Sequence, residues 1–161
     1  MQKEKTNMAE YERNLEDVLT LLGREHEEAL QLCGIIREGF RIKIPLQRIK
    51  DYADWYYESR LASHLENESR YIFPLFEEGD ELIKKTLSRQ RRLKRLFKDQ
   101  KHIEKSLSII EEELERLIRI HEKKMMKELK KCASLEQLLV IKKAYHNNGS
   151  GAKWPDVFWN D

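Results

Sequence analysis

The sequence contains few of the residues that interrupt helices, and few cysteines. Its 161 residues include only six glycines, three prolines and two cysteines. So few cysteines, with no CxxC pair, exclude a disulfide framework, and so few turn residues disfavour a β-sheet protein. Charged residues make up 37% of the chain, which is typical of amphipathic helices in water. We therefore expect an all-α protein with reduced thiols.

The sequence also lacks a long apolar run and an excess of one charge. No stretch approaches the roughly 18 apolar residues that span a membrane, and the first ten residues lack the apolar segment of a signal peptide. The 31 basic and 29 acidic residues are interspersed, and the basic run at residues 89–98 is interrupted at helical spacing by apolar residues. We therefore expect a cytoplasmic protein that binds neither nucleic acid nor membranes.

Apolar residues recur at helical spacing along most of the chain. The pattern predicts helices at residues 8–38, 45–72, 80–100, 106–131 and 134–146, followed by a tail at residues 147–161. Gly39, Pro45, Pro74 and Asp80 mark the first boundaries, and capping boxes at residues 108–111 and 134–137 mark the later ones. Long amphipathic helices with short connections predict one domain over residues 1–161, an up-down-up-down four-helix bundle with a short fifth helix.

The tail carries three large aromatic residues, Trp154, Phe158 and Trp159. Large apolar surfaces are rarely left in water. We expect these residues to pack back onto the bundle, either their own or that of a neighbouring molecule.

Polar residues interrupt the apolar stripe of each long helix. His26 lies on the first stripe, His64 and Glu68 lie one turn apart on the second, and Gln90 and His121 lie on the third and fourth. Counting about 1.5 Å per residue from the turns places these groups in one layer. Buried imidazoles and carboxylates are costly without partners, and a divalent metal is the simplest partner that all could share. A hydrogen-bonded network without an ion is the alternative.

With these residues the chain resembles the hemerythrin-like, HHE cation-binding family. The resemblance lies in REHEEAL, SHLENESRYIFPLF, TLSRQRRLKRLF, ELERLIRIHEKKMMKEL and the terminal WPDVFW. The family pattern is a histidine on the first helix, HxxxE on the second, a histidine on the third and HxxxE on the fourth, which together bind a carboxylate-bridged iron pair. His26, His64 and Glu68 match this pattern. The resemblance implies a four-helix bundle with metal in its centre.

The other half of the family's iron-pair site is altered in this chain. Gln90 stands at the third-helix histidine, Leu117 at the fourth-helix histidine and His121 at the bridging carboxylate. The resemblance therefore implies a mononuclear site of His26, His64, Glu68 and His121, with Gln90 as a weak ligand or a hydrogen-bond donor. Such a donor set suits iron, with zinc or manganese as alternatives.

A second register would use His102 and His121 as the two histidines, with Met125 at the carboxylate position. Charged residues surround His102 at helical spacing, so this side chain is expected to face water. We therefore disfavour the second register.

The resemblance implies a role in binding or sensing O₂ or NO, or in metal or redox stress. The expected partners are thus a metal ion and a diatomic gas, and the oligomeric state is open. No general base stands near the predicted site, so an enzyme is disfavoured. The alternative is a degenerate, metal-free bundle that serves as a structural or partner-binding module, which the changes at Gln90 and Leu117 favour.

Overall fold

The computed structural model describes residues 2–146 and 153–160, and the regular structure of these residues is entirely helical. This confirms the predicted all-α class. The α-helices are α1 (Gln2–Arg41), α2 (Leu46–Tyr56), α3 (Ala62–Asn67), α4 (Glu81–Lys98), α5 (Ile103–Arg116), α6 (Lys123–Cys132) and α7 (Leu135–His146). No helix in this part of the chain is long and apolar enough to cross a membrane. The predicted linker at residues 147–152 lies outside the described residues.

Short segments of π-helix and 3-10 helix join some of these helices end to end. The π-helical segments are η1 (Tyr57–Leu61), η2 (Glu68–Ile72) and η4 (Leu117–Glu122), and the 3-10 segments are η3 (Phe73–Leu75) and η5 (Phe158–Asn160). The predicted helix at residues 45–72 is thus α2, η1, α3 and η2 in succession. The predicted helix at residues 106–131 is likewise α5, η4 and α6.

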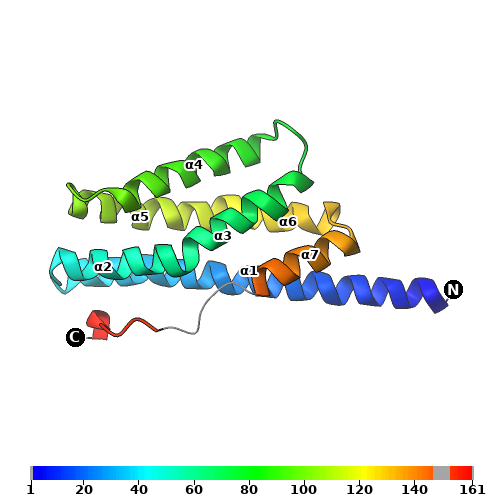
Figure 1. Ribbon diagram of the computed structural model, residues 1–161, viewed down its shortest axis with the longest axis horizontal. Coiled ribbons are helices and arrows are strands. Elements are labelled where there is room, and N and C mark those ends of the chain that lie inside the picture. The colour runs from blue at the N-terminus through cyan, green and yellow to red at the C-terminus, as the bar shows by residue number, and fades with distance from the viewer. Residues whose placement is uncertain (1, 147–152, 161) are drawn as a thin grey trace.

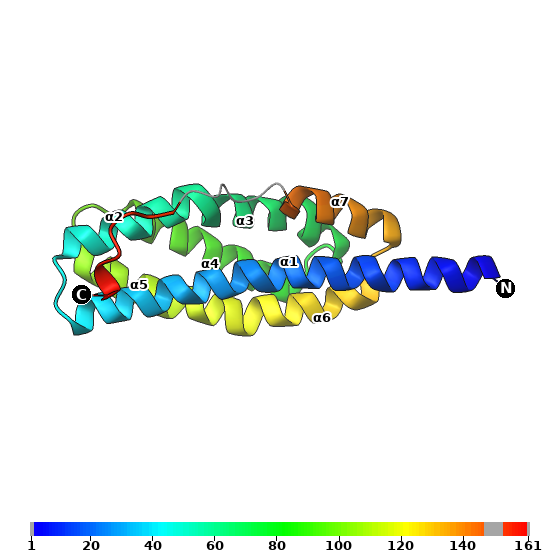
Figure 2. The ribbon, with the colours of Figure 1, turned by 90° about the horizontal axis from the view of Figure 1, so that it is seen from below.

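The longest helix, α1, provides the surface on which the other helices gather. It packs against α2, α5 and α7, while α4 packs against α5. Figures 1 and 2 show α2–α3 and α5–α6 running alongside α1, with the first turns of α1 extending beyond its neighbours. The long axes therefore lie roughly along one direction, and inward-facing residues from different helices can meet at the same height.

The turns before α4 and α7 are closed by polar side chains that begin the next helix. The Asp80 carboxylate accepts from the backbone N–H of Leu82 at 2.8 Å, as the sequence predicts for an N-cap. Ser134 and Gln137 form the predicted capping box.

The predicted capping box at residues 108–111 is wrong, because α5 begins earlier, at Ile103. Asp99 closes this turn instead. Its carboxylate accepts from the backbone N–H of Lys101 at 2.8 Å and from the Ser106 hydroxyl at 2.6 Å.

Two apolar clusters fill the interior, one toward each end of the molecule. The first, here called the tail-side cluster, includes Leu32, Cys33, Ile36, Ile49, Leu93, Leu114 and Phe158. The second, here called the α7-side cluster, includes Val18, Leu22, Ile72, Met125, Leu129, Leu138 and Ile141. Along α1 the change from one cluster to the other falls between Leu22 and Ala29. The predicted polar layer lies at this junction.

The aromatic tail packs onto its own chain, as expected. Phe158 is fully buried in the tail-side cluster, and Trp154 and Trp159 pack against the same cluster. Gly39 permits this approach, because an added Cβ would lie 3.2 Å from Cε2 of Phe158, as well as 2.7 Å from Cδ1 of Ile49. The tail thus covers one end of the helical assembly.

The two cysteines are free thiols in different environments, since Cys33 is buried and Cys132 is exposed. Burial raises the pKa of the Cys33 thiol to about 12. Cys33 therefore packs as a small apolar residue.

Candidate metal centre

Three buried side chains from different helices converge at the junction of the two clusters. They are His26 of α1, His64 of α3 and Glu122 at the end of η4, and one ligand atom from each lies within 4.8 Å of the others. His64 Nε2 lies 3.1 Å from Glu122 Oε1, and His26 Nε2 contacts Glu122 Oε2. The two imidazole nitrogens and the carboxylate therefore face one another.

Glu68 and Gln90 lie beside this group. Glu68 Oε2 is 3.8 Å from His64 Nε2, and the Gln90 amide donates to the same oxygen at 2.8 Å. Both side chains are buried. Glu68 thus lies next to the three converging side chains, and Gln90 orients it by a hydrogen bond, which is one of the two roles predicted for Gln90.

Glu25 is a neighbour of the centre that the sequence did not reveal. Its Oε2 lies 3.2 Å from Nδ1 of His64. A carboxylate on one ring nitrogen fixes the orientation of the imidazole and directs the other nitrogen toward the centre. Glu25 does not lie on the apolar stripe of α1, so the sequence pattern gives no sign of this contact. It becomes evident only because α3, which carries His64, lies beside α1.

The π-helical segments help to place the side chains of the centre. Glu68 is the first residue of η2, and Glu122 is the last residue of η4. A π-helical turn contains more residues than an α-helical turn, so it changes the direction of the side chains that follow it. As a result the consecutive residues His121 and Glu122 are both buried, although they have different partners.

The structure does not bring His121 to the cluster. Glu122 instead occupies the position that the sequence analysis assigned to His121. Nε2 of His121 accepts from the Arg89 guanidinium at 2.9 Å. Burial lowers the pKa of His121, and the positive charges of Arg89, Lys124 and Lys85 lower it further. His121 is therefore a neutral acceptor in basic surroundings.

A signal for Glu122 was present in the sequence. Glu122 follows Ile118 by four residues and precedes Met125 by three, which is the spacing of one helical stripe. His102 is exposed at the start of α5, as predicted, with 71% of its side chain accessible to solvent.

Three carboxylates, those of Glu25, Glu68 and Glu122, surround the two imidazoles of the centre. Burial raises the pKa of Glu68 well above its usual range, and the charge of Glu122 raises it further. Burial alone would lower the pKa of His64, but Glu122 and Glu68 outweigh it and hold this pKa well above its usual range. Burial opposes ionisation of Glu122, yet His64 and His26 keep its pKa well below the usual value. Without a metal ion, the protons on Glu68 and His64 therefore balance the Glu122 carboxylate, and a metal ion would bind in exchange for such protons.

The residues present fit a bound metal ion. Both oxygens of the buried Glu122 carboxylate face imidazole nitrogens, since Oε2 contacts His26 Nε2 and Oε1 lies 3.1 Å from His64 Nε2. One cation between the imidazole nitrogens and this carboxylate would use the lone pairs of all three side chains at once. Two imidazoles with one or two carboxylates are ligands suited to Fe(II), Zn(II) and Mn(II).

Comparisons with models of known protein families, with curated proteins and with solved structures give no match. The geometry of the centre therefore carries the functional conclusion.

A small cavity adjoins the centre. It has a volume of about 10 Å³, and its lining combines His26, Glu68 and Glu122 with the apolar residues Leu22, Ile72, Met125, Met126 and Leu129. Space for about one water molecule has a similar volume. Only a very small molecule can therefore lie beside the proposed ligands.

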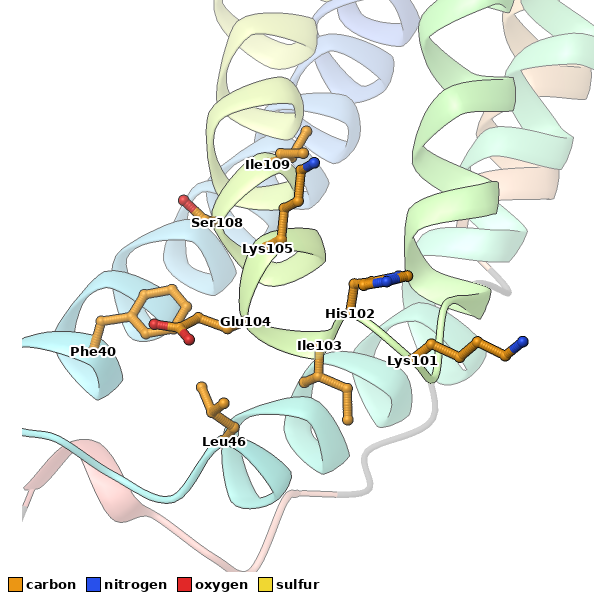
Figure 3. Close-up of a pocket in the computed structure, with 9 residues that line it drawn as sticks. All are labelled: Phe40, Leu46, Lys101, His102, Ile103, Glu104, Lys105, Ser108 and Ile109. Atoms are coloured by element: carbon orange, nitrogen blue, oxygen red, sulfur yellow. The ribbon is translucent and has the colours of Figure 1, made fainter.

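A much larger hollow, of about 950 Å³, lies elsewhere and contains no residue of the centre (Figure 3). It is lined by residues at the end of α1, the start of α2 and the start of α5. Its two groups that could bind a metal, His102 and Glu104, point in opposite directions in Figure 3. Size alone therefore does not identify the functional site.

Proposed function

We propose that this protein binds one transition metal ion, iron or zinc with manganese as a further alternative, through His26, His64 and Glu122. Glu68 lies close enough to serve as a fourth ligand, and Gln90 and Glu25 orient the ligands. The observation that carries this proposal is the convergence of three buried ligand atoms within 4.8 Å. Within the described residues this is the one such group, which favours a mononuclear site.

We further propose that the helices form an up-down-up-down four-helix bundle of the hemerythrin-like type. Ligands from α1, α3 and η4 appear in the order that this resemblance implies. The carboxylate of the last long helix is supplied by Glu122.

The function that best fits this centre is binding or sensing of O₂ or NO, or of metal or redox stress. Bound iron would supply the redox and gas-binding chemistry. The adjoining cavity supports this proposal, because its small volume and apolar residues suit a diatomic molecule better than a larger substrate. The chain's own residues hold the metal ligands in place and exclude bulk water.

Metal analysis of the purified protein after loading with iron(II) or zinc tests the proposal. We expect about one equivalent per chain. Less than a tenth of an equivalent of any transition metal would contradict it and would favour a metal-free module. About two irons per chain would contradict the mononuclear site.

Two matched variants locate the metal. His64→Ala should lose the bound metal, whereas His102→Ala should retain it because His102 lies at the surface. For the gas-binding role, nitric oxide added to the iron(II) protein should produce a new EPR signal that His64→Ala lacks.

A further inference from the structure

An open groove runs along the outer side of η4 and α6, next to α1. Its volume is about 670 Å³. The apolar residues that line this basic groove are Leu19, Ile120 and Met126. The basic residues that line it are Arg119, Lys123, Lys124, Lys127 and Lys130. No acidic residue lines it.

The positive charge of the basic groove is largely unpaired. Arg119 pairs with Glu115 at 3.0 Å. The four lysines are exposed and form no ion pair with any residue in the described ranges. Lys131, on another side of α6, does pair, with Glu128 at 3.5 Å. Unpaired lysines so close together repel one another, so an anionic partner would be bound favourably.

The apolar residues of the basic groove are also accessible. Ile120 is 45% exposed, and Leu19 and Met126 are half-buried. Residues 119–130 span about 16 Å of helix, which is roughly three turns. The basic groove therefore offers an apolar strip with lysines along it, over the length of a short helix.

We propose that the basic groove binds an acidic amphipathic helix of a partner protein. Apolar side chains of such a helix would contact Ile120, Leu19 and Met126, while its flanking carboxylates would pair with the lysines. A ligand with one carboxylate would leave most of the lysines unpaired. A nucleic acid would make no use of the apolar strip, and a flat membrane surface would not enter a groove.

A designed peptide provides the probe. It is a fluorescein-labelled helix of about 14 residues with leucines at positions i, i+4, i+7 and i+11 and glutamates beside them. The control peptide has the same composition with the leucines redistributed around the helix. Binding to the full-length, chelator-treated protein is measured by fluorescence anisotropy, because this proposal does not depend on the metal.

We expect saturable binding that is at least tenfold tighter for the amphipathic peptide than for the control peptide. The double variant Lys124→Glu/Lys127→Glu and the single variant Ile120→Ser should each weaken binding at least tenfold. The charge-matched variant Lys94→Glu/Lys98→Glu, on the exposed face of α4, should change it less than threefold. Circular dichroism of each variant confirms that the helices are retained.

Three results would overturn the proposal. The first is no binding of the amphipathic peptide, and the second is equal binding of both peptides. The third is tighter binding of phosphatidylglycerol vesicles or of a single-stranded oligonucleotide than of the amphipathic peptide.

Discussion

Two of the groups of buried charged side chains in this protein differ in how completely their charges are paired. The first centres on Lys50 of α2, which is fully buried. Its ammonium group donates to Asp54 at 2.6 Å and to the backbone carbonyl of Phe97 near the end of α4. One cation thus meets one carboxylate and one carbonyl, and this group joins α2 to α4.

The candidate metal centre is not balanced in this way. Its two imidazoles face three carboxylates, those of Glu25, Glu68 and Glu122. The comparison shows that burial of charge alone does not indicate function. Convergence of several possible metal ligands on one place is what supports the proposed metal site.

Removing Glu122 should have the largest effect on the unbalanced centre. We expect Glu122→Ala to lower the affinity for zinc or iron(II) by about 100-fold or more, because loss of a ligand should exceed the 10- to 100-fold typical of residues that only support a ligand. Competition titration with a chromophoric chelator measures this. Glu112→Ala, which removes an exposed carboxylate from α5, is the control. Equal affinities of the two variants would show that Glu122 is no ligand.

Removing Lys50 should instead destabilise the protein without affecting metal binding. Lys50→Met leaves the Phe97 carbonyl and the Asp54 carboxylate without their donor, at a cost of roughly 2–3 kcal/mol in the free energy of unfolding. Urea unfolding measures the change, with the exposed Lys94→Met as control. A Lys50→Met protein as stable as the control would show that this pairing contributes little.

Glu68→Gln should stabilise the chelator-treated protein, whereas Lys50→Met should destabilise it. The folded-state pKa of Glu68 is raised by burial and by Glu122, so the folded state binds more protons than the unfolded state between the two pKa values. Stability of the natural protein therefore falls as pH rises above about 4.5 and through the raised pKa of Glu68. Glutamine removes this loss, and we expect a gain on the order of 1 kcal/mol at pH 7.

Urea unfolding at several pH values between 5 and 8 tests this sign. The natural protein should lose more stability over this range than Glu68→Gln. If Glu68→Gln were less stable than the natural protein at pH 7, the raised pKa of Glu68 in the folded state would be contradicted.

The smallest effect on metal binding is expected for His121→Ala. His121 accepts a hydrogen bond from Arg89 and does not join the cluster of ligand atoms. Its removal should change the metal affinity less than threefold in the same competition titration. A loss as large as that of Glu122→Ala would restore the ligand set that the sequence predicts.

The helical positions of His26, His64, Glu68 and Gln90 were predictable because ordinary helical periodicity places them on apolar stripes. The candidate ligand on the fourth long helix was missed, because helical spacing gives both His121 and Glu122 apolar neighbours and does not choose between them. The π-helical η4, in which both side chains are buried, is not evident from the sequence. The start of α5 was misplaced because the turn at Asp99 contains neither glycine nor proline. Glu25 required knowledge of which helices are neighbours.

Met126 lines both the small cavity beside the metal centre and the basic groove on the outer surface. Its thioether side chain has three rotatable bonds and adapts readily to the space around it. The small cavity and the basic groove therefore share one adaptable side chain in their walls. A helix bound in the proposed groove would contact the same side chain that lines the cavity beside the candidate metal centre.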